Sequence, residues 1–160
     1  MALKAKVLGR EALTRRLNAL APNVEKYAAE AKMRAAEDLA DAIRAVAPRV
    51  TGGYADSIYG DLLNTTEFLN RVGIQASKDP SATGIFAKFI WRFLEFGTAT
   101  HSTVKGGGTV LGKKTASATS MHPGTAAQPH IFPTYRAMKK KIKRRIATAV
   151  NKAVREAQGK

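Results

Sequence analysis

Cysteine is absent from the 160 residues, which excludes disulfide bonds, thiolate metal ligands and a cysteine nucleophile. The chain also lacks an uncharged apolar run long enough to cross a bilayer. Its first ten residues carry charge throughout and contain no continuous apolar stretch of the kind found in signal peptides. We therefore expect a soluble, intracellular protein with no membrane partner.

Acidic side chains are scarce, because 12 Asp and Glu residues face 27 Lys and Arg residues, for a formal net charge of +15. Residues 134–160 contain ten basic residues and one acid, Glu156, so this segment contributes +9. This concentration of charge predicts a polyanionic or acidic partner, and the alternative is a surface that only aids solubility. The length predicts a single domain, residues 1–160, since two well-formed cores need a longer chain.

Apolar periodicity predicts a long N-terminal helix that follows Pro22 and ends at Ala47-Pro48. A leucine-striped segment from Leu13 to Leu20 precedes the proline. Alanine is the commonest residue of the apolar stripe, so another backbone element can approach this helix closely. The stripe consists of Val24, Ala28, Ala31, Ala35, Leu39, Ala42, Ile43 and Val46.

Beyond a turn at 50–53, β-favouring residues predict two strands, at 54–63 and 68–76, in a small antiparallel sheet. Asp79-Pro80 then predicts a helix start, and apolar pairs at helical intervals extend this helix to Gly97 as its C-terminal cap. Aromatic residues at helical spacing usually pack, so the aromatic cluster here predicts core or subunit interface. Residues assigned to core or interface are Phe89, Trp91, Phe93, Phe96, Ile131 and Phe132.

From Gly97 to Ala127 the composition changes, because 21 of these 31 residues are Gly, Ala, Ser or Thr and none is acidic. An extended loop of this length usually serves binding or becomes ordered on a partner. An extended stretch bracketed by Pro129 and Pro133 then leads into a basic C-terminal helix at 134–160. The fold class that follows is α+β, with a long N-terminal helix and a basic C-terminal helix packed on the small sheet.

Positive side chains crowd the N-terminal half of that last helix. They predict a surface that faces DNA phosphates or a partner protein, and a solvated or membrane-facing surface is the alternative. We assign this role to Lys139, Lys140, Lys141, Lys143, Arg144 and Arg145, together with Lys105, Lys113 and Lys114 of the extended loop.

Two patterns that could indicate an enzyme, a phosphate-binding loop and a pair of catalytic carboxylates, are incomplete in this sequence. Residues 107–114 approach a phosphate-binding loop, but Lys114 stands where a Ser or Thr must bind magnesium. Glu95 is the only acid between Asp79 and Glu156, so no paired-carboxylate mechanism is indicated. We expect no enzymatic activity.

Metal and cofactor binding lack a supporting pattern as well. The histidines at positions 101, 122 and 130 have spacings that match no helix or hairpin pair, and no cysteine accompanies them. We therefore expect neither a metal site nor a cofactor.

Taken in order, several short motifs resemble the tail-completion or neck proteins of long-tailed bacteriophages, often labelled tail components. The leucine-striped segment and long helix come first, and an aromatic run ends in the Glu-Phe-Gly-Thr motif of residues 95–98. The other motifs are Ala47-Pro48, Thr51-Gly52 and Ser57-Ile58, and the proline-bracketed stretch Gln128-Pro129-His130-Ile131-Phe132-Pro133. The Gly97 to Ala127 loop is longer than the corresponding segment of that family.

The resemblance implies a structural protein of the virion that assembles in the host cytoplasm as a homo-oligomeric ring. Such a ring would join the head connector to the tail, contact neighbouring head and tail proteins, and let DNA pass through its channel. A different class of function is a nucleoid-type protein that coats DNA without regard to sequence. That alternative predicts tight, strongly salt-dependent binding of duplexes by the isolated chain.

Overall fold

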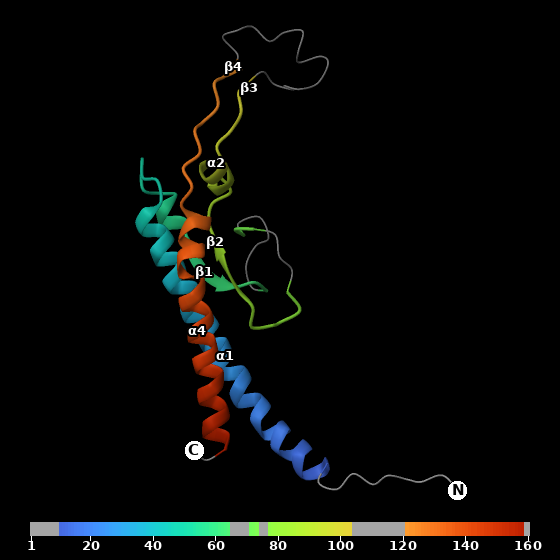
Figure 1. The fold of residues 1–160 in the computed structure, drawn as a ribbon. Coiled ribbons are helices and arrows are strands. Elements are labelled where there is room, and N and C mark those ends of the chain that lie inside the picture. Colours follow the sequence, from blue (N-terminus) through green and yellow to red (C-terminus); the bar gives the residue numbers. More distant parts are fainter. Residues whose placement is uncertain (1–9, 65–70, 74–76, 104–120, 159–160) are drawn as a thin grey trace, which may run out of the picture.

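The computed structural model describes residues 10–64, 71–73, 77–103 and 121–158. Two long helices, α1 (Arg10–Val46) and α4 (Ile131–Ala157), lie side by side and form the body of the fold (Figure 1). Within the described residues, none of the helices combines the length and the apolar character that crossing a membrane demands.

Helix α1 is continuous from Arg10 to Val46 and contains Pro22 in its interior. The expectation that the helix begins at Pro22, with a separate leucine-striped segment before it, is therefore wrong. Proline lacks an N–H and removes one hydrogen bond of the helix. The helical periodicity on both sides of the proline outweighs this local cost.

A small antiparallel sheet lies beside α1 and is built from β1 (Tyr59–Leu62) and β2 (Thr83–Phe86), after the short 3-10 helix η1 (Ala55–Ser57). Tyr59 pairs with Phe86 in the register, and their rings stack with centroids 5.4 Å apart. The α+β class is confirmed. The strand predicted at 54–63 is shorter than expected, because its first residues form the 3-10 turn.

The helix predicted from Asp79 to Gly97 is wrong. Its first half holds strand β2, and only α2 (Trp91–Phe96) is helical. Thr83 and Gly84 are poor helix formers, and pairing with β1 satisfies the backbone groups of this segment. The strand predicted at 68–76 falls largely outside the described residues, although Arg71 forms an isolated antiparallel bridge to Phe86.

The Gly97 to Ala127 segment is not a plain loop where the structure describes it. Strands β3 (His101–Ser102) and β4 (Met121–His122) pair in antiparallel fashion, and a bridge joins Thr98 to Thr125. This ribbon extends beyond α2, at the end of the molecule opposite the C-terminus (Figure 1). Lys105, Lys113 and Lys114 lie outside the described residues.

The basic C-terminal helix begins three residues earlier than predicted. Ile131 and Phe132 belong to the first turn of α4 and not to an extended stretch. Pro133 fits this turn because the first N–H groups of a helix have no partner within the helix.

The core lies where α1, the sheet, α2 and the start of α4 meet. Ile43, Ile58 and Phe86 are fully buried side chains there, and Trp91 and Ile131 join them. Small residues set the distance between elements, as the alanine stripe predicts. A Cβ added to Gly60 of β1 would lie 2.6 Å from the backbone carbon of Ala36.

Gly60→Ala is expected to destabilise the fold by about 1–3 kcal/mol, because the new methyl group must push β1 away from the α1 backbone. Denaturant unfolding followed by circular dichroism measures this change in the free energy of unfolding. Gly53→Ala is the matched control, because its Cβ would lie 3.7 Å from its nearest neighbour, the Lys88 Nζ atom. Equal losses in the two variants would contradict the close approach of β1 to α1.

Candidate assembly surfaces and the Glu95 cap

A buried carboxylate ties α2 to the start of α4. The Glu95 Oε2 atom accepts hydrogen bonds from the backbone N–H groups of His130 at 2.8 Å and Ile131 at 2.9 Å. Its Oε1 atom accepts from the N–H of Phe132 at 3.0 Å. These are N–H groups that a helix leaves without partners at its N-terminus, so Glu95 caps α4 from a neighbouring helix.

The electrostatics of this cap favour the ionised form of Glu95. Burial raises the pKa of its carboxyl. The three backbone donors and the nearby His130 ring lower this pKa, and together they outweigh the effect of burial. The net result is a pKa below the ordinary value. The N-terminal end of a helix carries partial positive charge, which adds to this preference for an anion.

His130 extends the buried network to η1. Its Nδ1 atom donates to the backbone oxygen of Gln128 at 2.7 Å, since a carbonyl can only accept. In the neutral ring the Nε2 atom then accepts a hydrogen bond from the Tyr54 hydroxyl at 2.7 Å. Burial, followed by the charge of Glu95, raises the pKa of Tyr54 to about 12. The network therefore links the start of η1, α2 and the start of α4 through buried side chains.

Gly97 lets the chain leave α2 immediately after the cap. Its φ of 72° lies in the left-handed region, and a Cβ there would meet the backbone oxygen of Thr125 at 2.5 Å. The predicted role of Gly97 as a C-terminal cap is confirmed, although the helix it ends is much shorter. The Glu-Phe-Gly-Thr motif thus places a capping carboxylate, an aromatic ring and a close backbone approach in consecutive positions.

Helix α2 and the residues just before it present a surface of exposed aromatic rings. Phe89, Phe93 and Phe96 are 66%, 50% and 64% exposed, and the rings of Phe89 and Phe93 meet edge to face with centroids 6.4 Å apart. We call these three residues the α2 aromatic surface. Helix α2 lies between the helical body and the β3–β4 ribbon (Figure 1).

The other residues assigned to core or interface lie inside the fold. Trp91 and Ile131 are buried, and Phe132 is partly buried against the core. The Phe132 ring lies 5.8 Å from that of Phe96, so the interior and the α2 aromatic surface are continuous. The predicted set is therefore divided by the structure into three buried or half-buried residues and three exposed ones.

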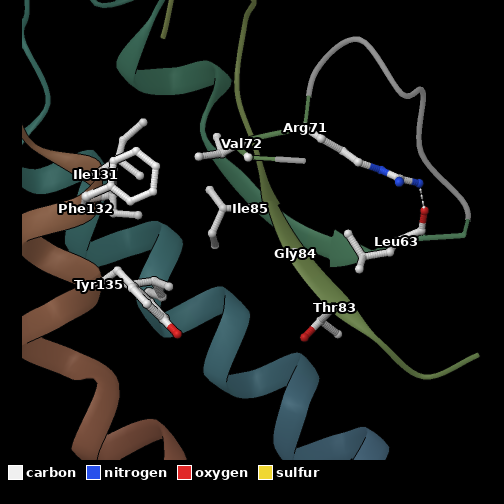
Figure 2. Close-up of a pocket in the computed structure, with 12 residues that line it drawn as sticks. Leu63, Arg71, Val72, Thr83, Gly84, Ile85, Ile131, Phe132 and Tyr135 are labelled. Atoms are coloured by element: carbon white, nitrogen blue, oxygen red, sulfur yellow. Dashed lines mark hydrogen bonds between the residues drawn. The ribbon is translucent and has the colours of Figure 1, made fainter. Parts of the chain in front are cut away.

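An apolar groove of about 340 Å³ opens beside this region, between α1, the sheet and α4. Figure 2 shows Ile131 and Phe132 on one side, Leu63 and Arg71 on the other, and Ile85 between them. The Arg71 guanidinium donates to the backbone oxygen of Leu63. The groove is walled by aliphatic and aromatic side chains, so it extends the apolar surface that adjoins Phe132.

The predicted basic residues of α4 lie on several sides of the helix, away from the side that packs on the core, and do not form one patch. Lys139, Lys140, Lys141, Lys143 and Arg144 are exposed, whereas Arg145 is half-buried. Arg145 forms an ion pair with Asp38 of α1, with 2.6 Å between Nη1 and Oδ2. Three of the six, Lys141, Arg144 and Arg145, line a second groove between α1 and α4.

Sequence reasoning missed the role of Glu95 and misjudged two histidines. His101 and His122 pair across the β3–β4 ribbon, and their rings stack with centroids 5.0 Å apart. The expectation that their spacing matches no hairpin pair is therefore wrong. His130 lies apart from them in the buried network. Within the described part of the chain, no three His, Asp or Glu side chains gather as metal ligands would.

Glu95→Gln is expected to destabilise the fold by about 2–3 kcal/mol at pH 7, because the amide loses the charge that the three N–H groups bind. The folded-state pKa of Glu95 is lowered, so its contribution is present above the unfolded pKa and is lost as pH falls through the folded value. The difference between variant and wild type should therefore shrink below pH 4.5.

Denaturant unfolding at pH 7 and at successively lower pH measures this difference. Glu25→Gln is the control, because Glu25 is an exposed acid of α1 and its substitution should stay within about 0.5 kcal/mol. A Glu95→Gln difference that is constant down to pH 3 would show that the carboxylate charge does not stabilise α4.

Comparison with known proteins links this arrangement to one family. Residues 11–97 match the sequence profile of the HK97-gp10-like family, described as "Bacteriophage HK97-gp10, putative tail-component". No curated protein and no solved structure gives a significant match. The matched residues include α1, the sheet and α2 with Glu95, and they stop before the Gln128 to Pro133 stretch. The match covers more than half of the chain, and the chain belongs to this HK97-gp10-like family of phage tail components.

Proposed function

We propose that the chain is a non-enzymatic structural subunit of a tailed-phage virion that assembles as a homo-oligomeric ring at the head-to-tail junction. In this role it is a neck or tail-completion component that joins the head connector to the tail. Membership in a family of tail components supports the general role. The observation that carries the proposal of self-assembly is the α2 aromatic surface.

Exposed aromatic rings are costly to leave in water. Burying one large apolar side chain stabilises by about 1.5–3 kcal/mol, and Phe89, Phe93 and Phe96 each leave half or more of their surface exposed in the single chain. A neighbouring subunit that covers these rings recovers it. A ring requires two different, complementary surfaces on every subunit, and the apolar groove beside Phe132 offers a second apolar surface.

The α2 aromatic surface is also held rigidly. Glu95 binds the start of α4, the N–H of Gln128 donates to the oxygen of Leu94 at 2.7 Å, and Trp91 anchors α2 in the core. Binding to a preorganised surface avoids the entropy cost of ordering it. This rigidity supports a role in a fixed assembly interface.

Partners other than the chain itself are the head-connector and tail proteins next to the ring. The β3–β4 ribbon extends away from the helical body beyond α2, which suits contact with such a neighbour (Figure 1). We propose that residues 97–127 make this contact in the virion. Equal protease protection of this segment in the free protein and in the assembled particle would contradict it.

Sequence-independent DNA binding of the nucleoid type is the second candidate function. The exposed basic residues of α4 and the net charge of +15 favour it. Light scattering at low and high salt, with and without a short duplex, separates the two candidates. A closed oligomer without DNA supports the ring, and a monomer that coats DNA and releases it in salt supports the second candidate.

The double variant Phe89→Ser with Phe93→Ser is expected to remain at the monomer mass of 17.2 kDa under conditions in which the wild type forms a closed oligomer. The reason is the loss of apolar surface that a neighbour covers. Light scattering coupled to size-exclusion chromatography measures the masses.

Val50→Ser is the control, because Val50 is fully exposed and lies outside α2. It should leave the oligomer unchanged. An unchanged oligomer in the double phenylalanine variant would rule out the α2 aromatic surface as the subunit contact. A wild type that stays at 17.2 kDa at every concentration would rule out self-assembly of the isolated chain.

A further inference from the structure

Helices α1 and α4 diverge toward the C-terminal end of α4 (Figure 1). A groove of about 600 Å³ lies between them. Five cationic side chains and one acid, Glu30, line it. The cations come from both helices and are Arg34, Lys141, Arg144, Arg145 and Lys152. The groove is thus distinct in composition from the apolar groove beside Phe132.

Two of these cations already have partners. Arg145 pairs with Asp38, and its Nη1 atom also donates to the backbone oxygen of Arg34 at 3.3 Å. Lys152 lies 3.8 Å from Glu156 and sits over the ring of Tyr27. These contacts fix the two walls of the groove relative to each other.

Three cations of the groove have no ion-pair partner among the described residues. They are Arg34, Lys141 and Arg144. All three are exposed at the groove. Arg34 lines the groove from α1 and the other two line it from α4, so an anion in the groove can be contacted from both helices.

We infer that this groove binds the phosphate backbone of duplex DNA, with Arg34, Lys141 and Arg144 as the phosphate-binding residues. Phosphate contacts need concentrated positive charge and no base-reading geometry. Along α4, the rise of the helix separates Lys141 and Arg144 by about 4.5 Å. That separation is close to the roughly 3.4 Å step between nucleotides of one strand, so neighbouring phosphates can be contacted together.

The lining favours DNA over an acidic protein segment. Protein interfaces depend on large apolar or aromatic anchors that enter pockets. Here the apolar lining consists of Ala31 and Ala149, and the hydroxyl of the one aromatic residue, Tyr27, already donates to Glu156 at 2.5 Å. Charge is therefore the main property that this groove offers to a partner.

In the proposed ring DNA passes through the channel, and the groove would be the part of each subunit that binds it. The biological role of the groove therefore rests on the proposed function. One subunit nevertheless contains the whole groove. DNA binding can thus be measured at the level of the single chain, separately from the oligomer mass. The loss of one property does not imply the loss of the other.

The test compares two triple variants with equal loss of charge. The groove variant carries Arg34→Gln, Lys141→Gln and Arg144→Gln. The control variant carries Lys78→Gln, Lys88→Gln and Arg136→Gln, three exposed positions outside the groove lining. Each variant has a net charge of +12, three below the wild-type value of +15.

Fluorescence anisotropy with a mixed-sequence duplex of about 20 base pairs gives affinity as a function of salt. The groove variant should bind roughly tenfold or more weakly, and the slope of log affinity against log salt should fall by about 2–3 for three lost contacts. The control variant should show much smaller changes in the affinity and in the salt slope. Circular dichroism and light scattering on all three proteins report folding and oligomer mass.

Three outcomes would overturn the inference. Equal weakening of both variants would mean that DNA responds to the overall charge and not to the groove. Wild-type binding of polyglutamate with no binding of the duplex would assign the groove to an acidic protein partner. A wild-type chain that binds neither polyanion at low salt would show that the groove has no such ligand. A normal oligomer mass in these cases would leave the ring proposal intact.

Discussion

The contact between one buried carboxylate and the N-terminus of α4 holds α2, α4 and the turn before β1 together. Glu95 satisfies three N–H groups that the helix cannot satisfy itself. Because Glu95 belongs to α2, this contact also fixes where the aromatic rings of that short helix are displayed. Because His130 continues to Tyr54, it fixes the turn that precedes β1. A short helix of six residues could not hold such a position by its own hydrogen bonds.

The parts of the fold that the sequence predicts are those in which periodicity persists over many residues. Helices α1 and α4 are long, so their apolar stripes identify them despite errors at Pro22 and at the start of α4. The segment from Asp79 to Gly97 is different, because apolar pairs spaced for a helix also suit a buried strand followed by a short helix. The pairing of Thr83–Phe86 with β1 favours the strand over the helix. Because β1 lies more than 20 residues away in the sequence, local periodicity could not reveal this pairing.

The candidate site divides in the same way. The sequence predicts that six residues, most of them aromatic, form core or a subunit interface, and half of that set, Phe89, Phe93 and Phe96, is exposed in the structure. The sequence does not show which of these residues are buried, because burial depends on which side of α2 packs against the core. The structure places Trp91 on that side. The capping role of Glu95 could not be predicted, because no side chain near it in the sequence indicates a hydrogen-bonding partner. Its partners are backbone groups, which no side-chain motif records.

The charge of the chain has a consequence for any assembly of several copies. Each added subunit brings a further +15, so the electrostatic self-energy of a compact oligomer rises faster than its number of contacts. Counterions reduce this repulsion over a screening length of about 8–10 Å at physiological ionic strength. The copy number that an assembly can reach therefore depends on the surrounding electrolyte as well as on the fit between subunits.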